Sequence, residues 1–187
     1  MQVTRTALAG LLILEPRAFG DARGYFYESW NDRQFRDAGI AETFVQDNRS
    51  FSRGGVVRGF HFQKRHAQGQ LVWVTEGRIF DVCVDIRLSS PTFGQWQSFE
   101  LEAFPPRMIY MPPGFAHGFC VLGEAAAVHY KCTEYYDPED EGGIIWNDPT
   151  LAIPWPLANP TVSARDAGFP SFAEVAAGAA AWQTDPP

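Results

Sequence analysis

Residues 56–63 read VVRGFHFQ, and residues 67–77 read AQGQLVWVTEG. Both stretches are rich in β-branched and aromatic residues, which is typical of strands. Strand alternation places His61 and Gln63 on one face of the first stretch and Gln70 on the inward face of the second. The interior of a β-barrel is expected to be apolar, so inward polar side chains indicate a function. Taken alone, His61 is more consistent with a hydrogen-bonded core histidine.

Similar strand-like runs, each closed by Gly, Pro, Asn or Asp, occur along most of the chain. The expected strands are Gly24–Ser29, Val56–Gln63, Leu71–Thr75, Arg78–Arg87, Gln95–Leu101, Met108–Met111 and Ala127–Thr133. Glu76-Gly77 is a candidate hairpin turn between two of them. Regular short strands separated by turns predict a mainly β fold, an antiparallel sandwich or barrel.

Only short helices are expected. Asn31–Ala38 has an Asn cap and is followed by a Gly, and both features are typical of a helix. In the Pro- and Ala-rich C-terminal region, Ala164–Ala181 predicts one or two weak helices packed on the outside. The chain shows no repeat and no linker, so we expect one domain over residues 1–187, with residues 160–187 as a peripheral helical tail.

The charge balance limits the partners. Asp and Glu outnumber Lys and Arg by 22 to 15, so the net charge is −7 and nucleic acid or an anionic membrane is not an expected partner. Only Lys64 and Lys131 among those 15 basic residues are lysines, which leaves 13 arginines. Arginine is a fixed planar donor that binds anions in a bidentate manner. The composition therefore favours capture of an anion by a local arginine cluster.

The cysteines and the N-terminus bear on the cellular compartment. Cys83, Cys120 and Cys132 are far apart and lie in apolar runs, so we expect buried free thiols and neither a disulfide scaffold nor a zinc site. The N-terminal stretch lacks the basic start and cleavage site of a signal peptide, and no run approaches the ~20 apolar residues of a membrane span. We expect a soluble, cytoplasmic protein.

A second segment, MPPGFAHGF at residues 111–119, contains another histidine. Two prolines and a glycine end one strand, and His117 follows the turn directly. Asp81, in the run FDVCVDIR, is a plausible buried partner for an inward imidazole. Asp85 has the same strand parity, so at least one of these two acids is expected to be exposed.

The two histidine segments resemble the two motifs of cupin barrels. His61 occupies the first ligand position, and Pro113-Gly114 precedes His117. Gln63 and Gln70 stand where a metal cupin has a His and a Glu, and neutral amides are poor ligands for a divalent metal. The resemblance therefore favours a metal-free cupin-type barrel or jelly roll. A cupin oxygenase or isomerase that uses both histidines with a metal is the alternative.

Longer matches point to one family. The strings FGDARGYFYES, FVQDNRSFS, GVVRGFHFQ, FDVCVDIR, SPTFG, PPGFAHGF, YKCTEYY and GIIWND occur in order over about residues 13–166. They resemble the successive signature segments of the dTDP-4-dehydrorhamnose 3,5-epimerase family. Several long motifs in one order make a specific resemblance that covers most of the chain.

The resemblance implies proton-transfer chemistry without a metal or redox cofactor, in deoxysugar or cell-surface polysaccharide biosynthesis. Family members epimerise a nucleotide-linked 4-keto-6-deoxyhexose at the carbons beside the ketone, C3, C5 or both, through an enolate, which requires a base, an acid on the opposite face and a partner for the oxyanion. By resemblance His61 is the base, Asp166 holds it and Tyr130 is the proton donor. Without the resemblance, Asp166 reads as a helix cap or a solvated acid.

The resemblance also implies residues that contact the substrate, and a homodimer in which an N-terminal strand is shared. These residues are Arg23, Phe26, Glu28, Gln46, Asn48, Arg58, Gln70, His117, Tyr136, Glu141 and Arg165. The arginines are suited to the diphosphate. Strict alternation places Arg58 on the face opposite His61, so a shared site requires a bulge at Gly59. Without the bulge, Arg58 would be a surface or dimer residue.

Two positions depart from the family pattern. Gln70 stands where typical members carry a lysine that stabilises the enolate, and Trp73 stands where they carry an arginine. Three explanations follow: a slower enzyme of the same specificity, a mono-epimerase or an enzyme for another nucleotide sugar, or a protein that binds without catalysis. The presence of His61, Asp166 and Tyr130 argues against the last. Trp73 indicates an altered pocket or interface.

Overall fold

Two long antiparallel strands, β7 (Gln70–Asp85) and β10 (Phe115–Cys132), form the centre of the computed structural model, which describes residues 1–181. The other strands are β1 (Gln2–Arg5), β2 (Leu12–Glu15), β3 (Ala18–Asp21), β4 (Gly24–Tyr27), β5 (Gln46–Arg53), β6 (Val57–Gln63), β8 (Trp96–Glu102), β9 (Met108–Met111) and β11 (Glu141–Gly143). The helices are α1 (Asp32–Asp37), α2 (Ala164–Ala167), α3 (Phe172–Gly178) and the 3₁₀ turn η1 (Ala179–Ala181).

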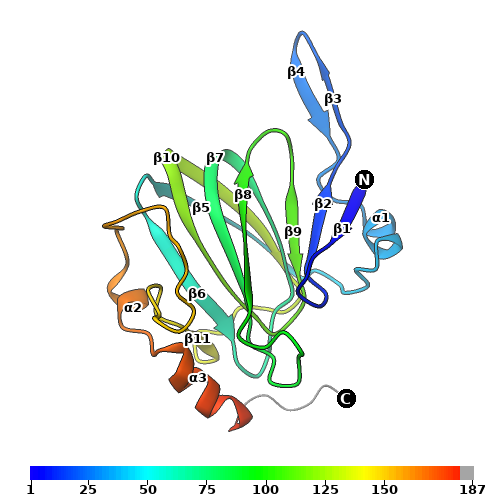
Figure 1. Cartoon of the computed structure of the whole chain (residues 1–187). Helices are drawn as coiled ribbons and strands as arrows, with labels where there is room; N and C mark the ends of the chain where they lie inside the picture. The colour runs from blue at the N-terminus through cyan, green and yellow to red at the C-terminus, as the bar shows by residue number, and fades with distance from the viewer. Residues whose placement is uncertain (182–187) are drawn as a thin grey trace.

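All the paired strands of the larger sheet are antiparallel. The order is β1-β2-β9-β7-β10-β6-β11, with β5 also paired to β10 and β8 to β7, while β3 and β4 form a separate hairpin. Figure 1 shows the sheet curving into an open barrel, with α1 on one side and α2 and α3 at the other. The predicted mainly β, antiparallel, cupin-type fold with a few short helices is confirmed.

The buried side chains divide between the interior of the barrel and its two outer faces. Leu11, Val72, Ile79, Leu101, Ile109, Met111 and Val121 belong to the interior cluster. On the outer face, Leu71 and Trp73 of β7 pack with Phe35 of α1. Lower on the sheet, Phe60 and Phe172 of α3 belong to a third cluster. α1 and α3 are thus each held by an aromatic side chain against the outer face of the barrel.

The expected hairpin turn at Glu76-Gly77 is wrong. β7 continues through both residues, so the strands expected over Leu71–Thr75 and Arg78–Arg87 are one element. The pairing of β7 with β10 shifts register between Leu122 and Ala126, opposite Gly77, which marks a bulge. Gly77 has φ +72°, and a Cβ there would lie 2.0 Å from the Ala125 carbonyl oxygen. The glycine therefore bends a continuous strand and does not reverse the chain.

The short helices form where they were predicted. α1 begins after Asn31, whose side chain accepts a hydrogen bond from the Gln34 amide. The region expected to be weakly helical contains α2, α3 and η1, and α3 carries a complete capping box between Ser171 and Glu174. Residues 182–187 of the predicted tail lie outside the described residues. The long polar strand β5 was not predicted.

Two other expectations concern buried groups. Cys83, Cys120 and Cys132 are free and buried, as predicted, and burial raises the pKa of Cys120 to about 11 and that of Cys132 to about 12. The expectation of an exposed acid on β7 is wrong, since Asp81 and Asp85 are both fully buried. Asp85 is satisfied there because its carboxylate accepts hydrogen bonds from the side chains of the following loop. Among residues 1–181, no helix is long and apolar enough to span a membrane.

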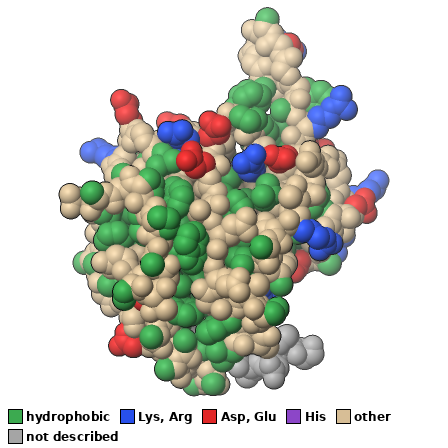
Figure 2. Space-filling view, in the orientation of Figure 1, with side chains coloured by type: hydrophobic (Ala, Val, Ile, Leu, Met, Phe, Trp, Pro, Cys, Tyr) green, Lys and Arg blue, Asp and Glu red, His purple; other side chains and the backbone are tan. Residues whose placement is uncertain are grey.

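The β3–β4 hairpin projects away from the barrel as an arm (Figure 1). Aromatic side chains on it are exposed, with Phe19 54% and Phe26 68% accessible. Figure 2 shows hydrophobic side chains exposed around the base of the arm. Tyr25 stacks on Phe104 of the body at a centroid distance of 4.4 Å. The arm is thus fixed at its base but leaves much apolar surface uncovered.

The bulge at Gly77 gives a stability prediction. Replacing Gly77 with Ala should lower the free energy of unfolding by about 2–5 kcal/mol, because the methyl group meets a backbone oxygen in addition to the unfavourable φ. Gly123→Ala is the matched control, since Gly123 has φ +90° but open space around the missing Cβ, and should cost about 1 kcal/mol. Urea denaturation measures both, and equal losses would contradict the steric explanation.

Candidate active site

A cavity of about 300 Å³ opens from the interior of the barrel. It is lined by Gln46, Asn48, Ser50, Arg58, His61, Phe62, Gln63, Ala67, Gln68, Gln70, Gly114, Phe115, His117, Phe119, Tyr130, Cys132, Tyr136, Glu141 and Arg165. Phe115 and Phe119 also belong to the interior core cluster, so the cavity rests directly on the core. Ten of the fourteen site residues predicted from sequence line this cavity.

A bulge in β6 brings two of these residues to one side. His61 pairs with His117 and Arg58 pairs with Phe119, so three steps on β6 face two steps on β10. Gly59 lies within this bulge at φ +111°, and a Cβ there would lie 2.6 Å from the Gly118 Cα. The bulge that a shared site requires is therefore present, and Arg58 and His61 line the same cavity.

His61 is supported by a buried carboxylate. Its Nε2 lies 3.0 Å from Oδ1 of Asp166, which is 2% exposed. Oδ2 of Asp166 accepts a hydrogen bond of 3.0 Å from the Gly59 amide. Burial alone would raise the pKa of Asp166, but the contact with His61 and the hydrogen bond from the Gly59 amide outweigh it and hold the pKa well below its usual range. Asp166 is therefore a buried anion beside His61, and the alternative of a solvated acid is wrong.

His117 forms a second imidazole–carboxylate pair. Its Nε2 lies 2.6 Å from Oδ2 of Asp81, and Asp81 is fully buried. The predicted partnership of Asp81 with an inward imidazole is confirmed. Because His61 and His117 are cross-strand neighbours, two imidazoles backed by separate carboxylates lie side by side on the cavity wall.

A neutral polar wall faces the cavity from β5, β10 and β7. Gln46, Cys132 and Gln70 are aligned in one row across the three strands, and Asn48 and Tyr130 are aligned in the next. Gln46 donates to the Asn48 side-chain oxygen at 3.0 Å, and Asn48 donates to the Cys132 sulfur at 3.6 Å. Burial raises the pKa of Tyr130, so its phenol stays protonated at neutral pH and can donate a proton.

Two atoms of this wall lack partners. The Ser50 hydroxyl and the Gln70 side-chain oxygen are buried and make no hydrogen bond within residues 1–181. A buried polar atom without a partner costs about 1–3 kcal/mol, so both atoms point to a polar ligand. Ser50 was missed from the sequence, although its spacing of two residues from Asn48 on a strand places both on one face. Trp73 packs on the outer face of β7 and does not line the cavity.

Two arginines and one acid complete the wall. Arg58 donates to the Ser52 hydroxyl at 2.8 Å and to the Phe51 carbonyl at 3.3 Å. Arg165 pairs with Glu141 at 2.8 Å and has a half-exposed side chain. Both guanidinium groups are therefore positioned by neighbours while they border the cavity, an arrangement suited to an anionic ligand.

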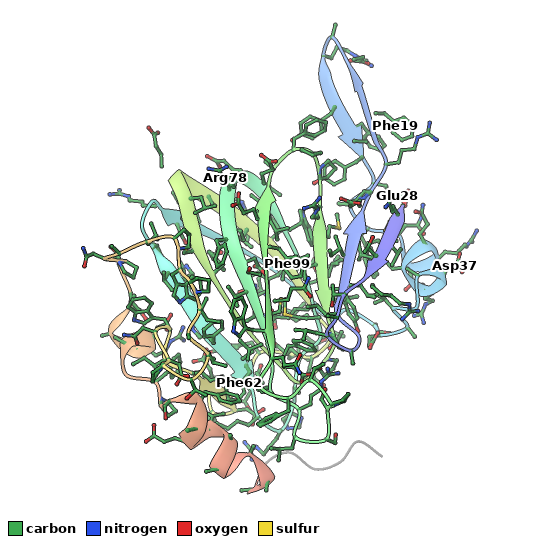
Figure 3. The ribbon with its side chains drawn as sticks, in the orientation of Figure 1. Phe19, Glu28, Asp37, Phe62, Arg78 and Phe99 are labelled. Carbon is green, nitrogen blue, oxygen red and sulfur yellow. The ribbon has the colours of Figure 1, made fainter. Side chains whose placement is uncertain are left out.

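Four predicted residues do not line the cavity: Asp166 lies behind His61, and the other three lie elsewhere. Arg23 and Phe26 are on the projecting arm, and the Arg23 side chain is 89% exposed and pairs with Asp21. Glu28 follows the arm and accepts a hydrogen bond from Gln34 at 3.3 Å. Figure 3 shows Phe19 on the arm and Phe62, a residue of the cavity wall, at the opposite end of the body. Within one chain, the arm therefore does not reach the cavity.

The residues expected at a cupin metal site were also located. His61, Gln63, Gln70 and His117 all line the cavity. In the part of the chain described, residues 1–181, no group of three or more His, Cys, Asp or Glu side chains could hold a metal ion. Elemental analysis of the purified protein distinguishes the metal-free hypothesis from the metal-dependent one.

Comparison with known proteins identifies the family. The family model described as dTDP-4-dehydrorhamnose 3,5-epimerase matches residues 5–174. The chain belongs to the dTDP-4-dehydrorhamnose 3,5-epimerase family. The dTDP-4-dehydrorhamnose 3,5-epimerase of Pseudomonas aeruginosa is 51% identical over 176 residues, which cover 93% of this chain and 97% of that protein. The resemblance of the motifs to this family is thus confirmed.

Solved structures of epimerases have the same fold. The dTDP-6-deoxy-D-glucose-3,5-epimerase of Legionella pneumophila, in complex with dTDP-4-keto-L-rhamnose, is 46% identical with a TM-score of 0.91, covering 95% of this chain and 96% of that chain. A 3'-monoepimerase of Streptomyces bikiniensis, in complex with dTDP-quinovose, is 30% identical with a TM-score of 0.85, covering 91% and 87%. The dTDP-4-dehydrorhamnose 3,5-epimerase fold thus occurs in double and single epimerases.

Proposed function

We propose that this protein is an isomerase that inverts C3 and C5 of a dTDP-4-keto-6-deoxyhexose in deoxysugar biosynthesis. The observation that carries the proposal is the pairing of His61 with the buried carboxylate of Asp166 in the same cavity as Tyr130. The proposed reaction removes a proton from the carbon beside the ketone, forms an enolate and returns a proton to the opposite face. No metal or redox cofactor is part of the proposal.

In this proposal His61 is the general base. Asp166 orients the imidazole and stabilises the imidazolium that forms when the carbon-bound proton arrives. Asp166 suits this role because its hydrogen bonds keep it ionised, and because the bulge amide of Gly59 fixes its second oxygen. His117, with its own carboxylate Asp81, is proposed to contact the sugar.

Tyr130 is the proposed acid. A phenol is a general acid only while it is protonated, and burial raises the Tyr130 pKa. Tyr130 comes from the part of β10 that pairs with β5, whereas His61 pairs with the beginning of β10. The two groups thus approach the cavity from different parts of its wall, which supports proton removal and return on opposite faces of the sugar.

The diphosphate and the nucleoside are proposed to occupy the open side of the cavity. Arg58 and Arg165 are suited to the diphosphate, and Glu141 lies beside Arg165. Tyr136, 47% exposed at the cavity edge, offers an aromatic face to the base. Gln46 and Asn48 are proposed to donate hydrogen bonds to the ligand. Free thiols in the three cysteines are consistent with a cytoplasmic location, which we propose as well.

We also propose a homodimer in which the arm of each subunit completes the partner's cavity. The support is that Arg23 and Phe26 are exposed on a hairpin that does not reach its own cavity. Glu28, at the base of the arm, is proposed to lie on the nucleoside side of the same composite site. Uncovered aromatic surface on the arm is typical of an interface.

The first prediction tests the reaction itself. With a dTDP-4-keto-6-deoxyhexose in heavy water, the protein should incorporate deuterium at C3 and C5, which NMR detects. His61→Asn should lower the exchange rate by about 10²- to 10⁴-fold, because the base is removed. His66→Asn is the control, since His66 does not line the cavity. Label at only one carbon would indicate a mono-epimerase, and label at neither would refute the proposal.

The second prediction concerns Gln70. Gln70→Met should lower exchange by about 10- to 100-fold, because it removes a hydrogen-bond donor proposed for the enolate oxygen, whereas Gln70→Lys should maintain or raise exchange. Gln97→Met is the control, since its side-chain oxygen is also buried and unpaired within residues 1–181 but lies outside the cavity. Lower exchange in Gln70→Lys would show that glutamine is adapted to a different substrate.

The third prediction concerns the shared arm. Arg23→Ala and His61→Asn proteins should each be impaired, but isolated hybrid dimers made by coexpression should recover about one half of the wild-type rate. In a hybrid, the intact arm of one subunit meets the intact His61 of the other at one of two sites. No recovery in hybrids isolated with two affinity tags would show that the arm does not act across the dimer.

A further inference from the structure

One nitrogen of His61 has two competing neighbours. Nε2 lies 3.0 Å from Oδ1 of Asp166 and 3.1 Å from Nη2 of Arg165. Both neighbours come from consecutive residues of the short helix α2. Arg165 also donates from Nε to the same Asp166 oxygen at 3.2 Å. The three groups meet at a single imidazole nitrogen.

This arrangement cannot satisfy all three groups at once. An imidazole nitrogen carries either a hydrogen or a lone pair, while a guanidinium only donates and a carboxylate only accepts. If Nε2 carries the hydrogen, it donates to Asp166 and faces a donor of Arg165. If Nε2 carries the lone pair, it accepts from Arg165 and faces the carboxylate. If His61 is an imidazolium, Nε2 carries a hydrogen, and the positive ring is also repelled by the positive guanidinium of Arg165.

The two forms of neutral His61 differ in their ability to accept a proton. When Arg165 donates to Nε2, the hydrogen of the neutral ring is on Nδ1 and Nε2 is occupied, so no lone pair is free. When Nε2 donates to Asp166, Nδ1 carries a free lone pair. Only the second form can remove a proton from a substrate. Arg165 and Asp166 therefore favour different neutral tautomers of His61, and only the tautomer favoured by Asp166 can act as the base.

Arg165 has an exposed side chain that a bound anion can draw away from Nε2, in competition with the carboxylates of Glu141 and Asp166 that also hold it. Its side chain is 51% exposed, it borders the cavity, and its Nη1 is held by Glu141 at 2.8 Å. The ring of Phe169 lies 6.0 Å from its guanidinium carbon, an apolar support that does not fix one direction. A diphosphate at the cavity mouth would offer oxygens with more charge than the neutral nitrogen of His61.

We propose that Arg165 is an anion-operated positioning residue: a bound diphosphate draws it off Nε2 of His61, which leaves Nε2 to Asp166 and frees Nδ1 as the base. This deepens the proposed function and rests on it. In the exchange, Nδ1 releases its proton to water and Nε2 takes one from water, so the ring remains neutral and no proton is gained or lost. Binding of the correct, diphosphate-bearing ligand thereby prepares the base.

The test is NMR of the full-length protein with ¹⁵N-labelled histidine, at about two pH units above the pKa of ~6.5 of an ordinary imidazole. The chain has four histidines, and the His61 signals are those missing in His61→Asn. In the free protein we expect the hydrogen on Nδ1. Saturation with inorganic pyrophosphate, verified by calorimetry, should move it to Nε2.

Two variants separate positioning from a structural role. Arg165→Ala should have the hydrogen on Nε2 with or without pyrophosphate. Arg58→Ala is the matched control, because Arg58 borders the same cavity but hydrogen-bonds to Ser52 and Phe51 instead of His61. It should weaken pyrophosphate binding and keep the hydrogen on Nδ1 in the free protein.

The inference is overturned if free wild-type protein already has the hydrogen on Nε2, or if Arg165→Ala keeps the hydrogen on Nδ1. It is also overturned if pyrophosphate does not bind, or if saturating pyrophosphate leaves the His61 signals unchanged. These outcomes do not depend on turnover. Deuterium exchange by wild-type protein with an unchanged tautomer would reject the inference and keep the epimerase proposal. A tautomer change without deuterium exchange would reject the epimerase proposal and keep the effect of the anion on His61.

Discussion

The antiparallel pairing of β7 with β10 is the interaction on which the other strands depend. β8 and β9 pair with β7, while β5 and β6 pair with β10. The bulge at Gly77 and Leu122–Ala126 bends this pair, so that β10 borders β6 in its first part and β5 in its last. His117 and Tyr130, on the same strand but in different parts, can therefore line one cavity. The bend converts a continuous ladder into the curved wall of a site.

The sequence predicted the parts of the fold where the pattern of apolar and polar residues matches the buried and exposed faces of the element. β9 was predicted at its observed bounds, and α1 formed behind its Asn31 cap. β5 was missed because its inward side chains, Gln46, Asn48 and Ser50, are polar, and apolar alternation is absent where a strand faces a polar cavity. Gly77 was mistaken for a turn because positive φ serves both turns and bulges, and only the partner strand distinguishes them.

Prediction of the site depended on more than alternation. Alternation alone separates Arg58 from His61, and only the bulge at Gly59 unites them. The position of Asp166 was predictable only from family motifs, because it reaches His61 from a helix more than one hundred residues away. The arm residues carry the family pattern but lie away from the cavity of their own chain, since a sequence motif does not specify which subunit it serves.

The two imidazoles of the cavity differ in how strongly their neighbours fix which ring nitrogen carries the hydrogen. Asp81 is fully buried and its Oδ2 lies 2.6 Å from Nε2 of His117. A hydrogen on that nitrogen therefore has one acceptor, the Asp81 carboxylate. Nε2 of His61 is contested by Asp166 and Arg165, and its side chain is more exposed, 30% against 12%. A group with a single fixed hydrogen is suited to orient a ligand. An imidazole whose hydrogen can change from one ring nitrogen to the other when a guanidinium moves is suited to exchange protons. This favours His61 as the base.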